Sequence, residues 1–479
     1  MGVTIPSAAG EVLEQYEVSN SLRFNSADSA YLHITPSASN RDLFTISLWA
    51  KRSSLNTGAR QVLFGVGNPA TSSQVGFEIR FDDSVGDGKL RITDYVAASS
   101  DNLVLKTNAL FRDPSAWYHI VFAYDSAQGT DSNRAKVYVN GTQITSFATA
   151  TYPSQNQDSA VGSNTKHLIG NLDGDGYDYN GYLTEVNYVD GAAKSPTDFG
   201  KFDDNGVWIP KRYTGTYGTN GFFLQFKQTG TSANSSGIGA DTSGNDNHFA
   251  VTNLAATDVT EDTCTNNFCT MSPIDTNRQA SLSEGNTQLQ RGSNYAGCNG
   301  TFGVSSGKWY WEVKTPSPTG NGENSGFGVT KIPHATIGNN YLGYQNATEW
   351  AIFIDNADSD IFKIYNNSTT DYNVNASSND IFQIALDMDN NKIYFGRNGT
   401  YFASGNPAGN SNEAYSSVSG DPFLFPAFSM NGNDTLQVNF GNPSFAISSG
   451  NTDGKYGNFE YAPPSGYYAL CTKRLAEFG

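Results

Sequence analysis

The sequence predicts an all-β fold built from two antiparallel β-sandwiches, and three observations support this class. Residues 380–399, DIFQIALDMDNNKIYFGRNG, predict two strands and their turn, because apolar side chains alternate along both halves and the Asn and Asp between them tolerate positive φ. Residues 117–141 predict a second hairpin of the same kind. The chain has 479 residues, too many for one ordinary core but suited to two sandwiches of roughly 150 to 250 residues each.

Residues 21–200 form the first predicted sandwich. Within residues 43–52, LFTISLWAKR, the side chains of Phe44, Ile46 and Leu48 share one parity, which is typical of a strand with one buried face. Other short strands occur at the spacing expected of a sandwich, in the segments SLRF, YLHI, QVLFGVG, GFEIRFDD, KLRITDY, HLIGN and YLTEVNYVDG. We expect the short polar segment 1–20 to act as an N-terminal docking tail.

Residues 201–279 form an irregular connecting region rich in Gly, Asn and Thr, with one clear strand predicted at 222–226. We expect this region to pack on the first sandwich, because leaving Trp208 and the phenylalanines of 222–226 in water would cost about 1.5 to 3 kcal/mol per side chain. Residues 280–479 form the second predicted sandwich with a short C-terminal tail, in which 472–478 predict a helical turn. Its core should contain Trp309 or Trp311 together with Phe395.

The first module resembles the laminin-G/concanavalin-A-like jelly-roll domain, in the variant common in marine bacteriophage genomes. The segments that carry this resemblance are SLRFN, FTISLWAKR, FRDPSAWYHIVFAYD, KVYVNG and GYLTEVNYVDG. The second module resembles the SPRY (B30.2-like) domain through GKWYWEVKT, SGFGVT, DMDNNKIYFGRNG and FPAFSMNGNDTLQVNFG. It lacks a clear PRY segment, so ligand loops cannot be transferred from the long vertebrate form. Both resemblances imply concanavalin-like sandwiches.

The resemblance implies a non-enzymatic surface protein of a bacteriophage virion, such as a fibre, appendage or capsid decoration. Its partners would be other virion proteins and a host cell-surface glycan or protein, and a homo-oligomer such as a trimer stays open. We expect synthesis in the host cytoplasm, because the N-terminus lacks a basic segment and an apolar core of secretory type. The alternatives are a secreted bacterial adhesin or lectin, which would need an export signal, and a polysaccharide-degrading enzyme.

Charge and hydropathy exclude two further classes of partner. The formal net charge is -17 and no basic run exceeds two residues, whereas a nucleic-acid partner requires clustered Lys and Arg. No stretch approaches the roughly 20 apolar residues of a membrane span. We therefore expect neither nucleic-acid binding nor membrane insertion.

A glycosidase of this fold would need two carboxylates on the same face of one strand, about 5 Å apart. Glu78, Glu185 and Glu312 each stand alone on a predicted strand, so we expect them to be solvent-facing or structurally paired. The five histidines show no spacing of zinc ligands. The sequence therefore predicts no catalytic residue.

The best candidate metal site is the loop that contains Asp173, Asp175 and Asp178. Calcium prefers six to eight oxygen ligands in such loops, and laminin-G-like relatives hold calcium at a sandwich rim, so calcium is the one cofactor we consider. Solvated turn acids are the alternative. A weaker candidate runs from Asp241 to Asp246, where the alternative is an Asx-type turn.

Candidate ligand-binding side chains are Tyr341 and Tyr344, because aromatic rings in a loop stack on sugars and anchor partners. Trp350 begins a strand, WAIFID, and is expected in the core. Cys264 and Cys269 could close a small disulfide loop, but two free thiols are the favoured interpretation.

Overall fold

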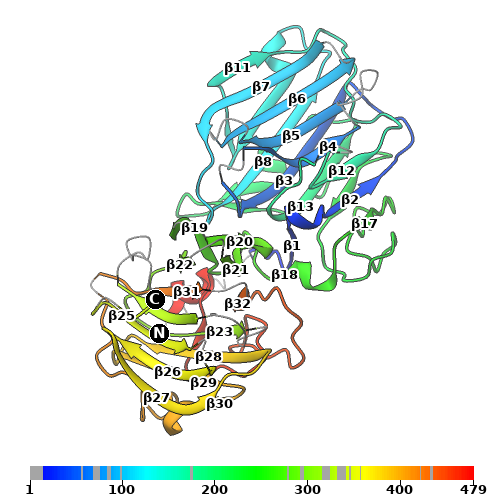
Figure 1. The fold of residues 1–479 in the computed structure, drawn as a ribbon. Coiled ribbons are helices and arrows are strands. Elements are labelled where there is room, and N and C mark those ends of the chain that lie inside the picture. Colours follow the sequence, from blue (N-terminus) through cyan, green and yellow to red (C-terminus); the bar gives the residue numbers. More distant parts are fainter. Residues whose placement is uncertain are drawn as a thin grey trace, which may run out of the picture.

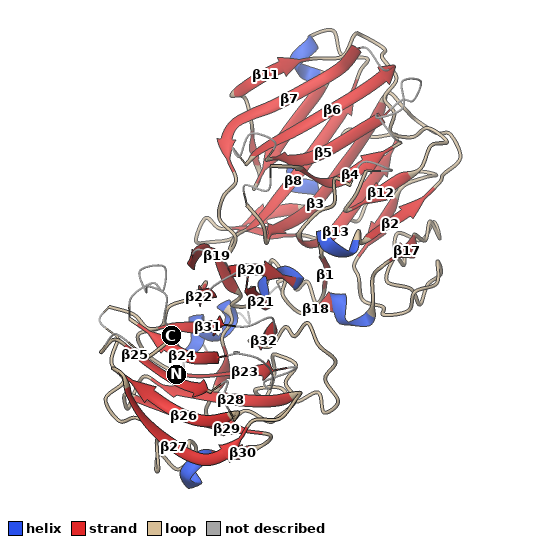
Figure 2. Ribbon diagram, viewed as in Figure 1, coloured by secondary structure: helices blue, strands red, loops and turns tan. Residues whose placement is uncertain are grey.

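The computed structural model confirms the all-β class, with a single α-helix among the residues it describes (Figure 2). The described residues are 15–55, 58–67, 76–83, 88–97, 100–172, 176–277, 280–291, 296–315, 324–331, 341–344, 347–355, 358–420, 422–431 and 435–479. Two sandwiches lie one beyond the other and meet where β1, β18, β20 and β21 come together (Figure 1). No helix in the described ranges is long and apolar enough to cross a membrane.

The first sandwich consists of two antiparallel sheets. One has the strand order β10-β9-β8-β3-β13-β1-β18, with β16 paired to β13, and the other has the order β11-β7-β6-β5-β4-β12-β2-β17. The strands of the first sheet are β1 (Ser21–Phe24), β3 (Leu43–Arg52), β8 (Trp117–Asp125), β9 (Ala135–Val139), β10 (Thr142–Gln143), β13 (Gly181–Asp190), β16 (Phe222–Leu224) and β18 (Val259–Thr260). Those of the second sheet are β2 (Tyr31–Ile34), β4 (Arg60–Val66), β5 (Gly76–Asp82), β6 (Lys89–Ala97), β7 (Ser100–Leu110), β11 (Phe147–Thr151), β12 (His167–Ile169) and β17 (Ala250–Thr252).

The connecting region is more regular than the sequence predicts. Besides a short ribbon of β14 (Gly200–Phe202) and β15 (Trp208–Pro210), it supplies β16, β17 and β18 to the sheets of the first sandwich. Phe222, Leu224 and Phe226 lie in the core between those sheets, while Phe223 packs on the opposite side of β13. The predicted strand at 222–226 is therefore two residues shorter, because Phe226 adopts a left-handed φ of 54° that ends it.

The second sandwich also has two sheets, in the orders β19-β22-β31-β24-β25-β26-β27 and β20-β21-β32-β23-β28-β29-β30, with β33 paired to β23. The first contains β19 (Met271–Asn277), β22 (Ala296–Gly300), β24 (Asn324–Thr330), β25 (Glu349–Ile354), β26 (Asp360–Tyr365), β27 (Ser368–Asn375) and β31 (Phe425–Asn431). The second contains β20 (Ala280–Ser283), β21 (Gln288–Arg291), β23 (Lys308–Thr315), β28 (Asp380–Asp387), β29 (Lys392–Arg397), β30 (Thr400–Tyr401), β32 (Thr435–Asn439) and β33 (Tyr468–Ala469). β19 begins at Met271 and pairs with β22, so the second sandwich begins before residue 280, where the sequence placed its start.

The hairpin predicted at 380–399 is formed by β28 and β29. The side chains of Phe382, Ile384 and Leu386 in β28, and of Met388 just after it, point into the second core. Asn391 takes the positive φ that the turn requires. Trp309, Trp311 and Phe395 lie in the same core, as predicted. The C-terminal helix α1 (Thr472–Phe478) forms where a helical turn was predicted and packs its Leu475 against that core.

Candidate functional site

The predicted calcium loop is only partly described by the structure. Asp173 and Asp175 lie outside the described residues. Asp178 is half-buried, accepts hydrogen bonds from Asn171 and Ser29, and has a pKa raised by burial. No group of three metal-binding side chains occurs within the described ranges. Calcium binding at this loop therefore stays a prediction.

The weaker metal candidate is an Asx-type turn. Both carboxylate oxygens of Asp241 accept hydrogen bonds within its own loop, from the backbone N–H groups of Ser243 and Asn247 at 2.8 and 3.0 Å. Oδ1 also accepts the N–H of Phe223 at 2.8 Å, which holds the loop against β16. This carboxylate therefore has a structural role.

Tyr341 and Tyr344 lie together beside β25, on the outer side of the second sandwich. The ring of Tyr341 stacks on Phe353 with centroids 4.1 Å apart, and the ring of Tyr344 meets it edge-on at 5.0 Å. Both side chains are half-buried, so each offers only part of its surface to a ligand. Trp350 is buried in the core, as predicted.

The three isolated glutamates are buried and structurally paired, which is the second of the two outcomes expected from the sequence. Glu78 is paired with Arg80 and accepts the hydroxyl of Tyr95 at 2.7 Å. Glu312 accepts the backbone N–H groups of Glu460 and Tyr461 at 3.0 and 2.7 Å.

The third glutamate, Glu185, occupies a β-bulge in β13 with a φ of 51°. It accepts the hydroxyl of Tyr16 at 2.9 Å, and its burial raises its pKa to about 7. This contact places the described end of the N-terminal segment on the first sandwich. Each glutamate thus serves a different local contact.

A shallow pocket of about 370 Å³ opens on the second sandwich where the β29–β30 turn meets the C-terminal loop. Gly399 takes a φ of 86°, and a Cβ there would lie 3.1 Å from the ring of Tyr461, so glycine allows that ring to close the pocket wall. Gln383 lies buried at the pocket and accepts the N–H of Gly399 at 2.8 Å. The wall also contains Tyr401, whose buried hydroxyl has no hydrogen-bond partner among the described residues.

This pocket combines two tyrosine rings with neutral amide groups, and its remaining wall includes Pro407 and Pro464. Aromatic faces and amides together suit a ligand that has both apolar surfaces and hydroxyl groups. The hairpin pattern of residues 380–399 places Gly399 in a turn, but only the fold brings Tyr461 against it. Sequence reasoning therefore missed this pocket.

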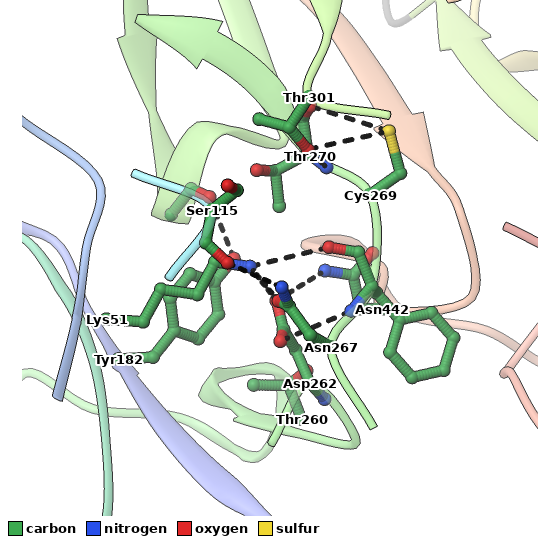
Figure 3. A network of polar contacts seen from close by, with 12 residues as sticks. Lys51, Ser115, Tyr182, Thr260, Asp262, Asn267, Cys269, Thr270, Thr301 and Asn442 are labelled. Carbon is green, nitrogen blue, oxygen red and sulfur yellow. Dashed lines mark hydrogen bonds and ion pairs between the residues drawn. The ribbon is translucent and has the colours of Figure 1, made fainter. Parts of the chain in front are cut away.

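The two sandwiches are joined by a buried polar junction, defined here by Lys51, Asp262 and Asn267 (Figure 3). Lys51 is the last residue but one of β3 in the first sandwich, and its Nζ lies 2.8 Å from Oδ2 of Asp262 and 2.6 Å from Oδ1 of Asn267. The exposed fractions of the Lys51 and Asp262 side chains are 1% and 0%, so water does not screen the pair.

The junction also reaches the end of the chain. The backbone N–H of Thr472 donates to the carbonyl of Asn267 at 2.8 Å, and Asn442 lies 3.5 Å from Asp262 through its Nδ2. Lys51 of β3 therefore contacts Asn267, whose carbonyl is hydrogen-bonded to Thr472, the first residue of α1.

Two further contacts cross between the sandwiches near the junction. Arg23 of β1 is fully buried and donates to the carbonyls of Thr257 and Pro443 at 2.6 and 3.2 Å. Tyr182 of β13 donates to the carbonyl of Gly285 at 2.8 Å, and a Cβ at Gly285 would lie 2.2 Å from that hydroxyl. Since buried charges without partners are costly, these contacts fix the relative orientation of the modules.

A cavity of about 400 Å³ lies beside these contacts, between residues 256–261 of the connecting region and 441–447 of the second module. Its lining is mixed, with Lys227 and Glu261 as well as Phe445 and Ile447. The two modules thus pack closely at the junction and leave a cavity next to it. The four cysteines, which could have added a covalent tie, are free thiols.

Comparisons with known families agree with the two modules. Residues 25–197 match the model of the concanavalin A-like lectin/glucanases superfamily (Laminin_G_3), and residues 308–443 match the SPRY domain. The chain therefore carries a concanavalin A-like domain followed by a SPRY domain. A search of curated proteins found no match.

Solved structures with local similarity include two SPRY domains and a pentraxin. The SPRY domain of human HERC1 shares 18% identity, covering 35% of this chain and 96% of that one, with a TM-score of 0.26. The TRIM65 PSpry domain shares 16%, covering 36% and 89%, with a TM-score of 0.26. The native heptameric SAP-like pentraxin from Limulus polyphemus shares 14%, covering 38% and 80%, with a TM-score of 0.28. At these TM-scores, the similarities carry no argument about function.

Proposed function

We propose that this chain is a non-enzymatic binding protein of a bacteriophage virion surface, which uses its lectin-like sandwiches to attach to a glycan of the host cell. The observation that carries the binding role is the pocket at Tyr401 and Tyr461, on a sandwich whose orientation the buried junction fixes. The resemblance of the first module to domains common in marine phage genomes supports the virion.

The pocket favours a neutral sugar over a charged ligand. Neither Lys, Arg, Asp nor Glu is among the residues that line it. Two tyrosine rings can stack on the apolar face of a sugar ring, and the neutral amide groups of the wall can pair with sugar hydroxyls. A ligand that brings a charge would lose hydration there without gaining a partner.

The alternative of a polysaccharide-degrading enzyme is less favoured. A glycosidase requires two carboxylates that share one substrate, whereas Glu78, Glu185 and Glu312 are each engaged in structural contacts on separate strands. A secreted bacterial adhesin would use the same pocket and differs from our proposal only in where the protein is found.

The binding experiment compares two tyrosine variants on an array of immobilised neutral oligosaccharides and on intact host cells. Tyr461→Ala removes a ring of the pocket but keeps the backbone N–H that donates to Glu312, so the fold should persist. We expect this variant to lose at least tenfold in affinity and Tyr344→Ala to bind like the parent. The reverse result would assign binding to the tyrosines predicted from the sequence, and no binding by the parent would refute the glycan proposal.

The location is tested separately on purified phage particles. Gold-labelled antibodies against this chain should decorate intact virions, and peptides of the chain should appear among the virion proteins by mass spectrometry. Detection only in the culture medium of uninfected bacteria would favour the adhesin.

A further inference from the structure

The junction between the sandwiches has the composition of a site for forming an amide bond between two side chains. A lysine amine, a carboxamide and a carboxylate are brought together by Lys51, Asn267 and Asp262, which come from β3 and from the segment that enters the second sandwich (Figure 3). We propose that Nζ of Lys51 forms an amide bond with Cγ of Asn267, which ties the two modules together covalently.

The atoms that would react are already close. Nζ of Lys51 lies 2.6 Å from Oδ1 of Asn267, and Cγ is bonded to Oδ1 at about 1.2 Å, so Nζ and Cγ are at most about 3.8 Å apart. Reactive geometries have separations of roughly 3 to 3.5 Å. The carboxamide is held in place, because its Nδ2 donates to the carbonyl of Ser115 at 2.5 Å.

The carboxyl group beside the amine is buried and can act as its proton acceptor. Asp262 is fully buried, and this burial raises the pKa of its carboxyl group. The Lys51 side chain is nearly as buried as that of Asp262. An uncharged amine is the nucleophile in such a reaction, and Asp262, whose Oδ2 lies 2.8 Å from Nζ, is placed to take the proton of Lys51.

The step balances without an oxidant, a reductant or a cofactor. Nζ attacks Cγ of Asn267, and the Nζ–Cγ bond forms while the Cγ–Nδ2 bond breaks. Asp262 gives its proton to Nδ2 and takes one from Nζ, so it ends as the carboxylic acid that it was before the attack. Ammonia leaves, and the product is a secondary amide between Lys51 and Asn267.

The bond would have a mechanical consequence. It would close a covalent loop from β3 of the first sandwich to the residue that pairs with the start of α1, across 216 positions of sequence. A force applied through β3 and the second module would then pass through this bond, and the chain between Lys51 and Asn267 could not extend unless the bond broke. This inference is independent of which ligand the protein binds.

The test is the intact mass of the full chain, followed by a tryptic digest. We expect the parent to be lighter than its sequence by one ammonia and to yield a branched peptide in which Lys51 is linked to Asn267. The mass of the parent protein tests the proposal by itself, without any variant. If the parent has its full sequence mass, Lys51 forms only an ion pair. If the mass is lower by one water, the bond lies on Asp262 instead. Either result would overturn the proposal.

Two variants provide matched controls. Lys51→Arg keeps a cation beside Asp262 but has no amine to attack, and Asn267→Ala keeps the Lys51–Asp262 pair but has no carboxamide. Both should show their full sequence mass, and far-UV circular dichroism shows whether they fold. Loss of ammonia that persists in either variant would place the reaction elsewhere and refute the assignment.

Discussion

Two tryptophans of β23 allow a matched test of how an unpaired donor affects the stability of the second core. Trp309 and Trp311 lie two residues apart on one strand, point into the same core and are both fully buried. Nε1 of Trp309 donates to the carbonyl of Ser306 at 2.8 Å, whereas Nε1 of Trp311 has no partner within the described part of the chain. The hydrogen bond is thus the main difference between them.

The expected difference follows from replacing each ring by phenylalanine. Both replacements remove a similar volume, so the cost of the cavity largely cancels in the comparison. Trp309→Phe also loses a hydrogen bond worth about 0.5 to 1.5 kcal/mol, while Trp311→Phe removes a buried unpaired N–H whose burial costs about 1 to 3 kcal/mol. We therefore expect Trp309→Phe to have the lower free energy of unfolding, by about 2 kcal/mol or more.

Urea titration followed by far-UV circular dichroism measures this difference without depending on tryptophan fluorescence. With a slope of about 2 kcal/mol per molar urea, the two midpoints should differ by about 1 M. Each tryptophan changed to alanine should cost about 3 to 5 kcal/mol and serves as the control for burial. Equal midpoints for the two phenylalanine variants would refute the reasoning.

Three further predictions concern other parts of the chain. If the loop Asp173–Asp178 binds calcium, added calcium should raise the melting temperature of the parent but not of Asp175→Asn, and a parent that melts alike in calcium and EDTA would have ordinary turn acids there. Burial raises the pKa of Glu185 from 4.5 to about 7, so between these pH values the folded state holds more protons than the unfolded state. The free energy of unfolding should therefore fall as pH rises through this window, and urea titrations at several pH values should show a flatter dependence for Glu185→Gln. Gly285→Ala places a Cβ against the Tyr182 hydroxyl at a φ of 64°, so calorimetry should show the two modules unfolding at more widely separated temperatures than in the parent.

Local alternation was sufficient to predict most of the sheets. The hairpin at 380–399 could be read directly, because its two strands and its turn are contiguous and each residue's parity fixes its face. The strands β17 and β18 could not be read in this way. They have three and two residues, and they form only because β2 and β1, more than 200 positions earlier, offer free edges.

The candidate sites rest on weaker sequence signals than the fold, for a related reason. Tyr341 and Tyr344 were selected because aromatic residues cluster in the sequence, and in the structure Tyr341 stacks on Phe353 while Tyr344 meets Tyr341 edge-on. The pocket at Tyr461 depends on a contact between residues 399 and 461, which no local pattern encodes. Aromatic content alone therefore does not separate a binding surface from a packed one.

Charged residues inside otherwise apolar strands are the sequence signal that could have indicated the junction. Arg23 in SLRF and Lys51 in LFTISLWAKR occupy positions that alternation assigns to the outer face of a sheet, where a solvent-exposed charge is the ordinary expectation. Both are buried, because the connecting region and the second module cover that face. A buried cation persists only where another segment supplies carboxylates or carbonyls, as Asp262 does for Lys51. An isolated cation in a predicted strand of a chain with two sandwiches therefore indicates where the modules meet.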